Sequence, residues 1–305
     1  SSTTSASFSG YALGDTQYFR VQAQSGSQSS SYSTPVNSVV IVNAPNAPTG
    51  LSTTDGLPIG TSWTSPVTST RDSTFDGTNS GATVSQTGKL GSAWSFDGTN
   101  DSVDLGSASK WVGKEDLSFS LWLNLDSATN DWTVPFQIGD AENPRIALTM
   151  DYYNSGGLMY YKMSEGSGNN YAQGSASAPA KGSWTHIVGV MDGSTSDIQL
   201  YVDGSSVSTT VTGTPTGTPS NLAGNGYLGN SMYGSTSYWT NGLMDQLVFY
   251  DTALTSSDVT ALYNSGSGDS TPDTTGMIAH YDFEQTGSTL ESQVFSTTGD
   301  GGSAI

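Results

Sequence analysis

Apolar and polar residues alternate along much of the central chain. In the segment from Leu117 to Leu125, every odd-numbered position is apolar, and residues 198–203 alternate in the same way. Residues 103–105, 187–191 and 243–250 are further apolar runs of strand length. Because successive side chains of a strand point to opposite faces, this period of two predicts strands with one buried face.

Asp-Gly and Asn-Gly pairs stand beside these runs. Both pairs tolerate positive φ and favour tight hairpins. They occur at positions 97–98, 192–193, 203–204, 225–226 and 241–242. Many short strands separated by turns are typical of a sandwich or a barrel, so we expect an all-β fold.

A single segment has the pattern of a helix. Thr255 precedes Asp258 by three positions, as in a capping box. Val259 and Leu262 then lie on one helical face, and Asn264 can end the helix in a left-handed conformation. We therefore expect one short helix late in the chain.

Composition divides the chain into five parts. Residues 1–46 contain two strand-like runs, and residues 47–50 end a stretch rich in Pro and Gly, which predicts a linker. Residues 51–266 are expected to form one domain. A second linker follows at 267–275, and residues 276–305 contain one more strand-like run.

Charge restricts the partners. The chain has 8 Lys and Arg against 27 Asp and Glu, a net charge of -19, and no Cys. Phosphate binding requires clustered cations, so nucleic acid is a poor partner. No run of 18 apolar residues occurs, so we expect no membrane insertion. A chain without disulfides but rich in neutral polar residues favours an extracellular surface protein of a prokaryote or a virus.

Four stretches in the central part carry a family resemblance. They are Gly88–Leu105, Leu117–Leu125, Trp184–Gly204 and Gly242–Leu254. In this order they resemble the laminin-G-like jelly roll, a family of the concanavalin A-like lectin/glucanase superfamily. The resemblance implies a two-sheet antiparallel jelly-roll sandwich over residues 51–266.

The flanking parts resemble pieces of β modules. Residues 18–50 are similar to the last two strands of a fibronectin type III domain, and residues 276–284 are similar to the opening strand of a further laminin-G-like module. Either the chain is a piece of a longer protein, or its end strands complete the sheets of neighbouring copies. The second alternative predicts a filament built by strand addition.

The sequence offers little for catalysis. Glucanases of the superfamily use a Glu-x-Asp-x-x-Glu strand, since two carboxylates must flank one glycosidic bond. This array is absent, and the chain has only two His residues. We expect a non-catalytic protein, with His186 packed in the core or at an edge and hydrogen-bonded.

Calcium is the cofactor that the sequence favours. Asp97, Asn100 and Asp101 form an oxygen-rich loop, and Asp245 shares strand parity with apolar neighbours. Calcium prefers such oxygen ligands, and the resemblance implies acids from these two regions. The alternative is that Asp97 caps a turn while Asp245 accepts backbone N–H groups.

Aromatic side chains are the candidates for sugar binding. Tyr152, Tyr153, Tyr233, Tyr238 and Trp239 lie in expected loop or rim positions, although aromatics of a sandwich can also simply pack. The favoured function is a structural or adhesive module whose partners are other copies or neighbouring surface modules. The alternative is a calcium-dependent, lectin-type module that binds glycans.

Overall fold

The chain consists of two compact units, Ser1–Pro66 and Val67–Ile305. The computed structural model describes residues 16–17, 24–25, 28–29, 39–40, 69–114, 116–129, 132–139, 145–152, 157–163, 171–195, 197–212, 222–233 and 236–297. In the first unit, β1 (Thr16–Gln17) pairs with β4 (Val39–Val40), and β2 (Gln24–Ser25) pairs with β3 (Gln28–Ser29). The predicted fibronectin-like segment lies largely outside the described residues.

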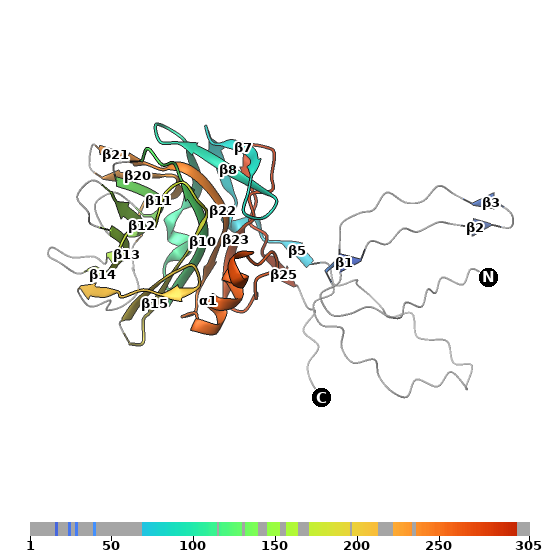
Figure 1. The fold of residues 1–305 in the computed structure, drawn as a ribbon. Coiled ribbons are helices and arrows are strands. Elements are labelled where there is room, and N and C mark those ends of the chain that lie inside the picture. The colour runs from blue at the N-terminus through green and yellow to red at the C-terminus, as the bar shows by residue number, and fades with distance from the viewer. Residues whose placement is uncertain are drawn as a thin grey trace, which may run out of the picture. The chain divides into compact units, whose positions relative to one another are not determined.

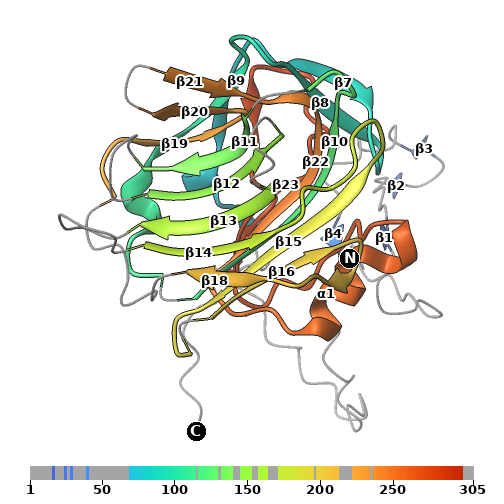
Figure 2. The same ribbon diagram turned by 60° about the vertical axis from the view of Figure 1, so that its left-hand side comes forward.

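The second unit contains two large antiparallel sheets, which Figures 1 and 2 show as two layers. The eight-stranded sheet has the order β17 (Ser205–Ser206), β16 (Asp197–Val202), β15 (Thr185–Asp192), β10 (Leu117–Leu125), β22 (Asn241–Tyr250), β8 (Ser92–Asp97), β7 (Thr83–Thr87), with β23 (Met277–Tyr281) also on β22. The nine-stranded sheet has the order β18 (Thr210–Thr212), β14 (Tyr171–Ala176), β13 (Gly157–Met163), β12 (Arg145–Asp151), β11 (Trp132–Ile138), β19 (Asn225–Leu228), β9 (Ser102–Ser107), β6 (Gly77–Ser80), β24 (Thr289–Leu290).

Two short strand pairs and three 3-10 turns complete the unit. The pairs are β20 (Asn230–Tyr233) with β21 (Thr236–Trp239), and β5 (Ser69–Arg71) with β25 (Phe295–Thr297). The 3-10 turns are Ser73–Phe75, Ala108–Trp111 and Asn264–Gly266.

Aromatic contacts between the two sheets form the core. The ring of Phe119 on β10 lies 5.0 Å from that of Phe136 on β11 and 4.9 Å from that of Tyr160 on β13. Phe136 in turn lies 5.0 Å from Phe249 on β22, and all four rings are fully buried. The two-sheet antiparallel sandwich predicted from the sequence is thereby confirmed.

The predicted helix is α1 (Ser256–Tyr263), and both halves of its capping box form. The Thr255 side chain accepts from the backbone N–H of Asp258, whose carboxylate accepts from the N–H of Thr255. Asn264 is left-handed, with φ 47°. Val259 and Leu262 are buried, so the helix packs on the outer face of the eight-stranded sheet.

A β-bulge interrupts β22. Ser120 of β10 pairs with Val248, but Trp122, two residues on, pairs with Asp245, three residues back. Gln246 takes up the extra residue with φ 49°. The residues of β22 that face the core are therefore odd-numbered after the bulge and even-numbered before it. Asp245 faces away from the core, although its spacing of two from Leu247 predicts the opposite.

The C-terminal segment corrects the predicted domain boundary at residue 266. Residues 276–297, here named the C-terminal arm, supply β23 to the eight-stranded sheet, β24 to the nine-stranded sheet and β25 to β5. The arm also fills the core, because Tyr281 and Phe283 are fully buried and Phe283 packs 5.9 Å from Trp94. The described arm thus belongs to the same domain rather than to a further module or a neighbouring copy.

The predicted turns are partly wrong. Asp203 and Gly204 do form a positive-φ turn between β16 and β17. Residues 225–226 and 241–242 instead lie within β19 and β22. A dipeptide that tolerates a turn does not force one where neighbouring strands pair with its backbone.

Candidate functional site

The outer face of β11 and β12 carries polar side chains. Ile146, Leu148 and Met150 of β12 point into the core, so the alternate residues point away from it. These alternate residues are Arg145, Ala147, Thr149 and Asp151, and each is at most 7% exposed. Other parts of the chain therefore cover this face of the nine-stranded sheet.

One part of the cover is the hairpin β20–β21. The Ser231 hydroxyl, on β20, donates to the side-chain oxygen of Gln137, which lies opposite Ala147 in the sheet. Thr133 of β11 donates through its hydroxyl to Thr240, just beyond the hairpin, over 3.3 Å. Hydrogen bonds thus join β11 to the hairpin and to the residue that follows it.

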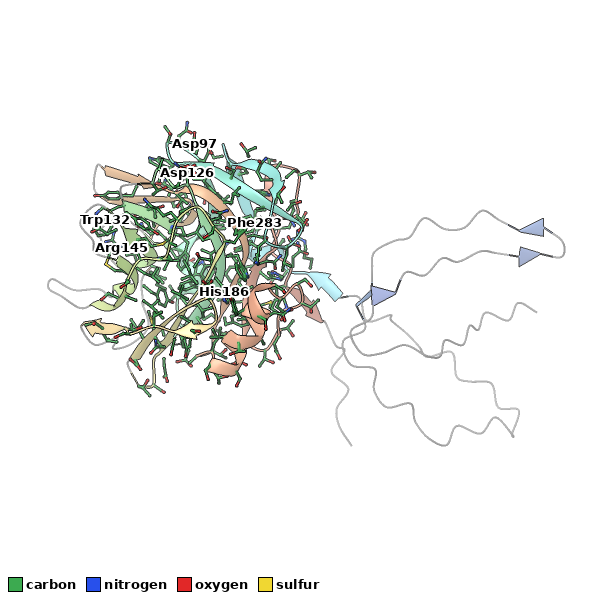
Figure 3. The ribbon with its side chains drawn as sticks, in the orientation of Figure 1. Asp97, Asp126, Trp132, Arg145, His186 and Phe283 are labelled. Atoms are coloured by element: carbon green, nitrogen blue, oxygen red, sulfur yellow. The ribbon has the colours of Figure 1, made fainter. Side chains whose placement is uncertain are left out.

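Trp132 and Tyr238 form an aromatic pair on this face. The centroid of Trp132, at the start of β11, lies 6.0 Å from that of Tyr238 in β21, and the two rings are tilted by 46°. Trp132 is directly opposite Asp151 in the sheet and so shares its outward face. Both residues are half-buried. Figure 3 labels Trp132 and Arg145 on the nine-stranded sheet. We call Trp132 and Tyr238 the aromatic platform.

The predicted ligand-binding residues fall into three groups. Tyr238 and the half-buried Trp239 lie in β21, and Tyr233 ends β20, so these three share one hairpin. Tyr152 follows β12 but packs toward the core. Tyr153 lies outside the described residues.

Tyr152 is engaged within the protein. Its hydroxyl donates to the carbonyl oxygen of Pro179 over 3.0 Å, and the Lys181 ammonium lies 5.0 Å from its ring centroid. Burial raises the pKa of the Tyr152 hydroxyl to about 12. The structure therefore separates Tyr152 from the hairpin aromatics with which the sequence grouped it.

Asp97 and Asp101 lie together in the β8–β9 turn. Asp97 accepts the backbone N–H groups of Thr99 (2.8 Å) and Asn100 (3.2 Å), so it caps the turn. Asp101 accepts the N–H of Asp97 over 3.0 Å. Burial raises the pKa of Asp101, and the charge of Asp97 adds to the rise.

Asp245 lies elsewhere. It is 0% exposed, its Oδ2 accepts the backbone N–H of Leu90 over 2.8 Å, and its Oδ1 has no hydrogen-bond partner. Burial raises its pKa to about 7, against the lowering effect of backbone N–H groups from Leu90, Gln246 and Lys89. Asp97 pairs with Asn241, four residues before Asp245 on β22, a separation of about 13 Å along a strand.

The structure thus does not bring the four predicted metal ligands together. Asp97, Asn100 and Asp101 share one turn, and Asp245 serves the loop before β8. Among the residues described, no three His, Asp or Glu side chains gather as a metal-binding group. Calcium binding at the 97–101 turn stays a prediction, which unfolding temperatures in excess calcium and in excess chelator would test.

His186 packs as the sequence predicts. It is fully buried, and its Nε2 lies 2.8 Å from the Ser120 hydroxyl. Its ring packs against both Trp122 and Tyr263, at centroid distances of 5.0 and 5.8 Å, and these two rings also contact each other at 5.8 Å. Burial lowers its pKa to about 3, so the ring is neutral at physiological pH. In the described part of the chain, no helix has the length and apolar character needed to cross a membrane.

The solved structures with similar folds share little sequence identity with this chain. Domain 4 of AbnA, a GH43 extracellular arabinanase from Geobacillus stearothermophilus, is 22% identical, with a TM-score of 0.45, 63% of this chain and 88% of that one covered. The Ruminococcus gnavus IT-sialidase CBM40 is 15% identical, with a TM-score of 0.45 and coverages of 58% and 97%. A SAP-like pentraxin from Limulus polyphemus is 19% identical, with a TM-score of 0.43 and coverages of 55% and 80%. No curated protein matches the chain.

A family model describes most of the sandwich. The laminin-G model of the concanavalin A-like lectin/glucanases superfamily matches residues 97–260, more than half of the chain. The match runs from the end of β8 into α1, and so includes β10, β15 and the platform strands. The protein therefore belongs to the laminin-G-like family of the concanavalin A-like lectin/glucanases superfamily.

Proposed function

We propose that the protein is a non-catalytic glycan-binding module and that it binds sugars at the aromatic platform. The observation that carries the proposal is the half-buried pair Trp132 and Tyr238, which stands on a polar sheet face beside Asp151. Aromatic rings pack against the C–H faces of sugars, and nearby carboxylates and amides accept hydroxyl hydrogen bonds. The lectins that give the superfamily part of its name agree with this role.

A binding role fits this site better than hydrolysis. Glycosidases place two carboxylates about 5–10 Å apart around one bond. The direct cross-strand neighbours of Asp151 are Trp132 and Gly157, neither of which is acidic. The carboxylate of Asp104, on β9, is held by the side chain of Asn225 at 2.9 and 3.0 Å.

Glycan binding would serve the wider adhesive role that the composition favours for an extracellular surface protein. The prediction of a filament has a weaker basis than glycan binding. It rests only on the resemblance of the two end segments to parts of β modules. In the structure, β23 of the C-terminal arm completes the edge of β22 within the chain. Electron microscopy of the purified chain would test assembly independently of sugar binding.

The test is a glycan array probed with the full chain, followed by titration calorimetry. We expect Trp132→Ala to weaken binding about tenfold or more, because truncating a central aromatic anchor costs about 1.4 kcal/mol or more. Tyr238→Ala should have a similar effect. The matched control is Tyr152→Phe, which removes only the bonds of that hydroxyl to the Pro179 carbonyl oxygen and the Met150 sulfur. Absence of binding to any glycan, or equal binding by Trp132→Ala, would refute the proposal.

Two further measurements assign the rest of the surface. Trp239→Ala shows whether the platform extends along β21. Repeating the titration in excess chelator separates calcium-dependent from calcium-independent binding. If the Asp97–Asp101 turn holds calcium for sugar binding, chelator and Asp101→Asn will weaken affinity to the same extent.

A further inference from the structure

We propose that the hairpin β20–β21 is a lid and that the sugar site continues beneath it, where Thr149 and Asn230 bind sugar hydroxyls. The proposal rests on the proposed function, because it extends the site of the aromatic platform inward. It follows from two buried polar atoms, from their position beside one bulge of β11 and from the way in which the hairpin is attached.

Two buried polar side chains near the platform each have an atom without a hydrogen-bond partner in the described part of the chain. Thr149 of β12 is 2% exposed and lacks a partner for its Oγ1. Asn230 of β20 is 7% exposed and lacks one for its Oδ1. Buried polar atoms are nearly always hydrogen-bonded, because an unpaired one is unfavourable. A bound molecule that supplies these hydrogen bonds is therefore favoured at both atoms.

Both side chains lie beside the bulge of β11 at Val134 and Pro135. The pairing of β11 with β12 is interrupted there, so that Thr149 alone lies opposite these two residues. On the other side of β11, Gly229 donates its N–H to the Pro135 carbonyl oxygen over 2.8 Å, and Asn230 is the next residue. Neighbouring strands are about 4.8 Å apart, so two strand spacings, about 10 Å, separate Thr149 from Asn230. One oligosaccharide can contact both.

The two atoms match the chemistry of a sugar. The Thr149 hydroxyl both donates and accepts hydrogen bonds, whereas the Asn230 Oδ1 only accepts them. A sugar hydroxyl also does both, so it satisfies either atom without introducing a charge. Trp132 lies two residues before the bulge on the same strand. A sugar chain stacked on Trp132 can thus continue toward Thr149 and Asn230.

Both groups are buried, so a sugar reaches them only when the cover of the sheet moves. Among the described strands, β20 and β21 pair only with each other and form a separate two-stranded sheet (Figure 2). Backbone hydrogen bonds fix the base of the hairpin, from Gly229 to Pro135 and from Thr240 to Gly229. Above the base, Ser231 bonds to Gln137 through side chains. Because no strand ladder holds β20 and β21 on β11, we expect them to open about this base by local unfolding.

The aromatic platform lies across the boundary between lid and sheet. Trp132 belongs to β11 of the sheet and Tyr238 to β21 of the hairpin, with ring centroids 6.0 Å apart. Opening of the hairpin separates the two rings and admits a sugar between them. The platform then forms the entrance of the site, and Thr149 and Asn230 form its interior.

Thiol labelling tests the lid, because the chain has no Cys and a single introduced thiol gives the whole signal. Ser231→Cys replaces a serine of β20 that is 3% exposed. Its matched control is Ser118→Cys on the outer face of the eight-stranded sheet, where the serine is 0% exposed and its hydroxyl donates to the Thr252 carbonyl oxygen over 2.7 Å.

We expect Ser231→Cys to react with a thiol reagent under native conditions at least about tenfold faster than Ser118→Cys, because local opening requires less free energy than global unfolding. Urea unfolding of both variants checks that their global stabilities are similar. Equal labelling rates at similar stability would overturn the lid.

Thr149→Val tests the interior of the site, because it removes one hydroxyl and keeps the size of the side chain. We expect it to bind the strongest ligand of the glycan array about tenfold more weakly without any loss of stability. Asn230→Ala should also weaken binding. The matched control is Thr78→Val, the same change at an exposed position of β6 in the same sheet, which should leave the affinity unchanged.

The outcomes separate this proposal from the proposed function. A glycan that depends on Trp132 but binds equally to wild type and Thr149→Val would overturn the interior contacts and leave the platform intact. Absence of binding to every glycan would refute the proposed function and the sugar contacts together. Slower labelling of Ser231→Cys in saturating glycan would support both, because the sugar would then occupy the space beneath the hairpin.

Discussion

The outer faces of the two sheets are both covered, but by different chemistry. On the eight-stranded sheet, helix α1 places Val259 and Leu262 against Val188 and Val248. On the nine-stranded sheet, the hairpin β20–β21 meets β11 through polar contacts such as that between Ser231 and Gln137. One cover is a second hydrophobic layer, and the other combines hydrogen bonds with the aromatic contact between Trp132 and Tyr238.

This difference separates stabilising structure from a candidate binding face. Apolar burial contributes about 25 cal/mol per Å² to stability, whereas a buried hydrogen bond contributes only about 1 kcal/mol net. A polar cover is thus a weak way to stabilise a sheet. Buried sheet faces are usually covered by apolar side chains, and exceptions are expected where function requires them. In this protein the polar cover lies beside Trp132 and Tyr238.

The largest expected effect concerns Asp245, on the outer face of the eight-stranded sheet. Its folded-state pKa of about 7 lies above the ordinary value of 3.8. The stability that protonated Asp245 contributes is therefore fully present below its unfolded-state pKa of 3.8, and it is lost as the pH rises toward 7. Relative to Asp245→Asn, the wild type should lose about 2–3 kcal/mol between about pH 5 and pH 8. Urea unfolding of both proteins across this pH range measures the difference in unfolding free energy. The same pH dependence in wild type and Asp245→Asn would contradict the prediction.

Leu262→Ala tests the apolar cover. Leu262 is 7% exposed between α1 and the sheet, so its truncation should cost about 2–3 kcal/mol of unfolding free energy. Glycan affinity should not change, because the platform lies on the other sheet. Chemical denaturation and calorimetry together check both statements, and a parallel loss of affinity would show that the two faces are coupled.

Trp132→Ala should behave in the opposite way. The residue is half-buried rather than buried, so we expect a stability loss of only about 1 kcal/mol, alongside the loss of sugar binding. Leu262→Ala is therefore expected to lose stability and keep glycan affinity, and Trp132→Ala is expected to lose affinity and keep most of its stability. A large drop in the unfolding temperature of Trp132→Ala would indicate that the platform is structural.

The smallest expected effect is that of Thr149→Val. The Thr149 hydroxyl is buried on the polar face without a hydrogen-bond partner. Replacing it by a methyl group of similar size should raise the unfolding free energy by about 0.5–1 kcal/mol. Denaturant melts resolve this shift, and destabilisation of the variant would reveal a partner for the hydroxyl.

Sequence patterns predicted the regular parts of the fold. The alternation from Leu117 to Leu125 became the central strand β10, and Thr255 with Asp258 capped α1. These features are local, because each depends on residues within one strand or one helical turn. His186 was also predicted correctly, since a neutral ring among aromatics fits a strand interior.

The remaining features depend on contacts between distant residues. The bulge at Gln246 moves Asp245 away from Asp97, and no local pattern marks it. Trp132 was not among the predicted residues, and Pro135 in the same run weakens the strand pattern there. The C-terminal arm was assigned elsewhere because its fit against Trp94 appears only when both sheets are assembled.

The pairing of β5 with β25 has a mechanical consequence. The chain comes into the sandwich through β5 and leaves through β25, and Ser69 lies directly opposite Thr297. Tension on the chain from both sides would therefore load the open end of a three-pair ladder, and the pairs would separate one after another rather than together. Tension applied at Ser69 and Thr297 would therefore detach the C-terminal arm from its sheets before it loaded β10. The rest of the sandwich would not lie along the direction of the applied force.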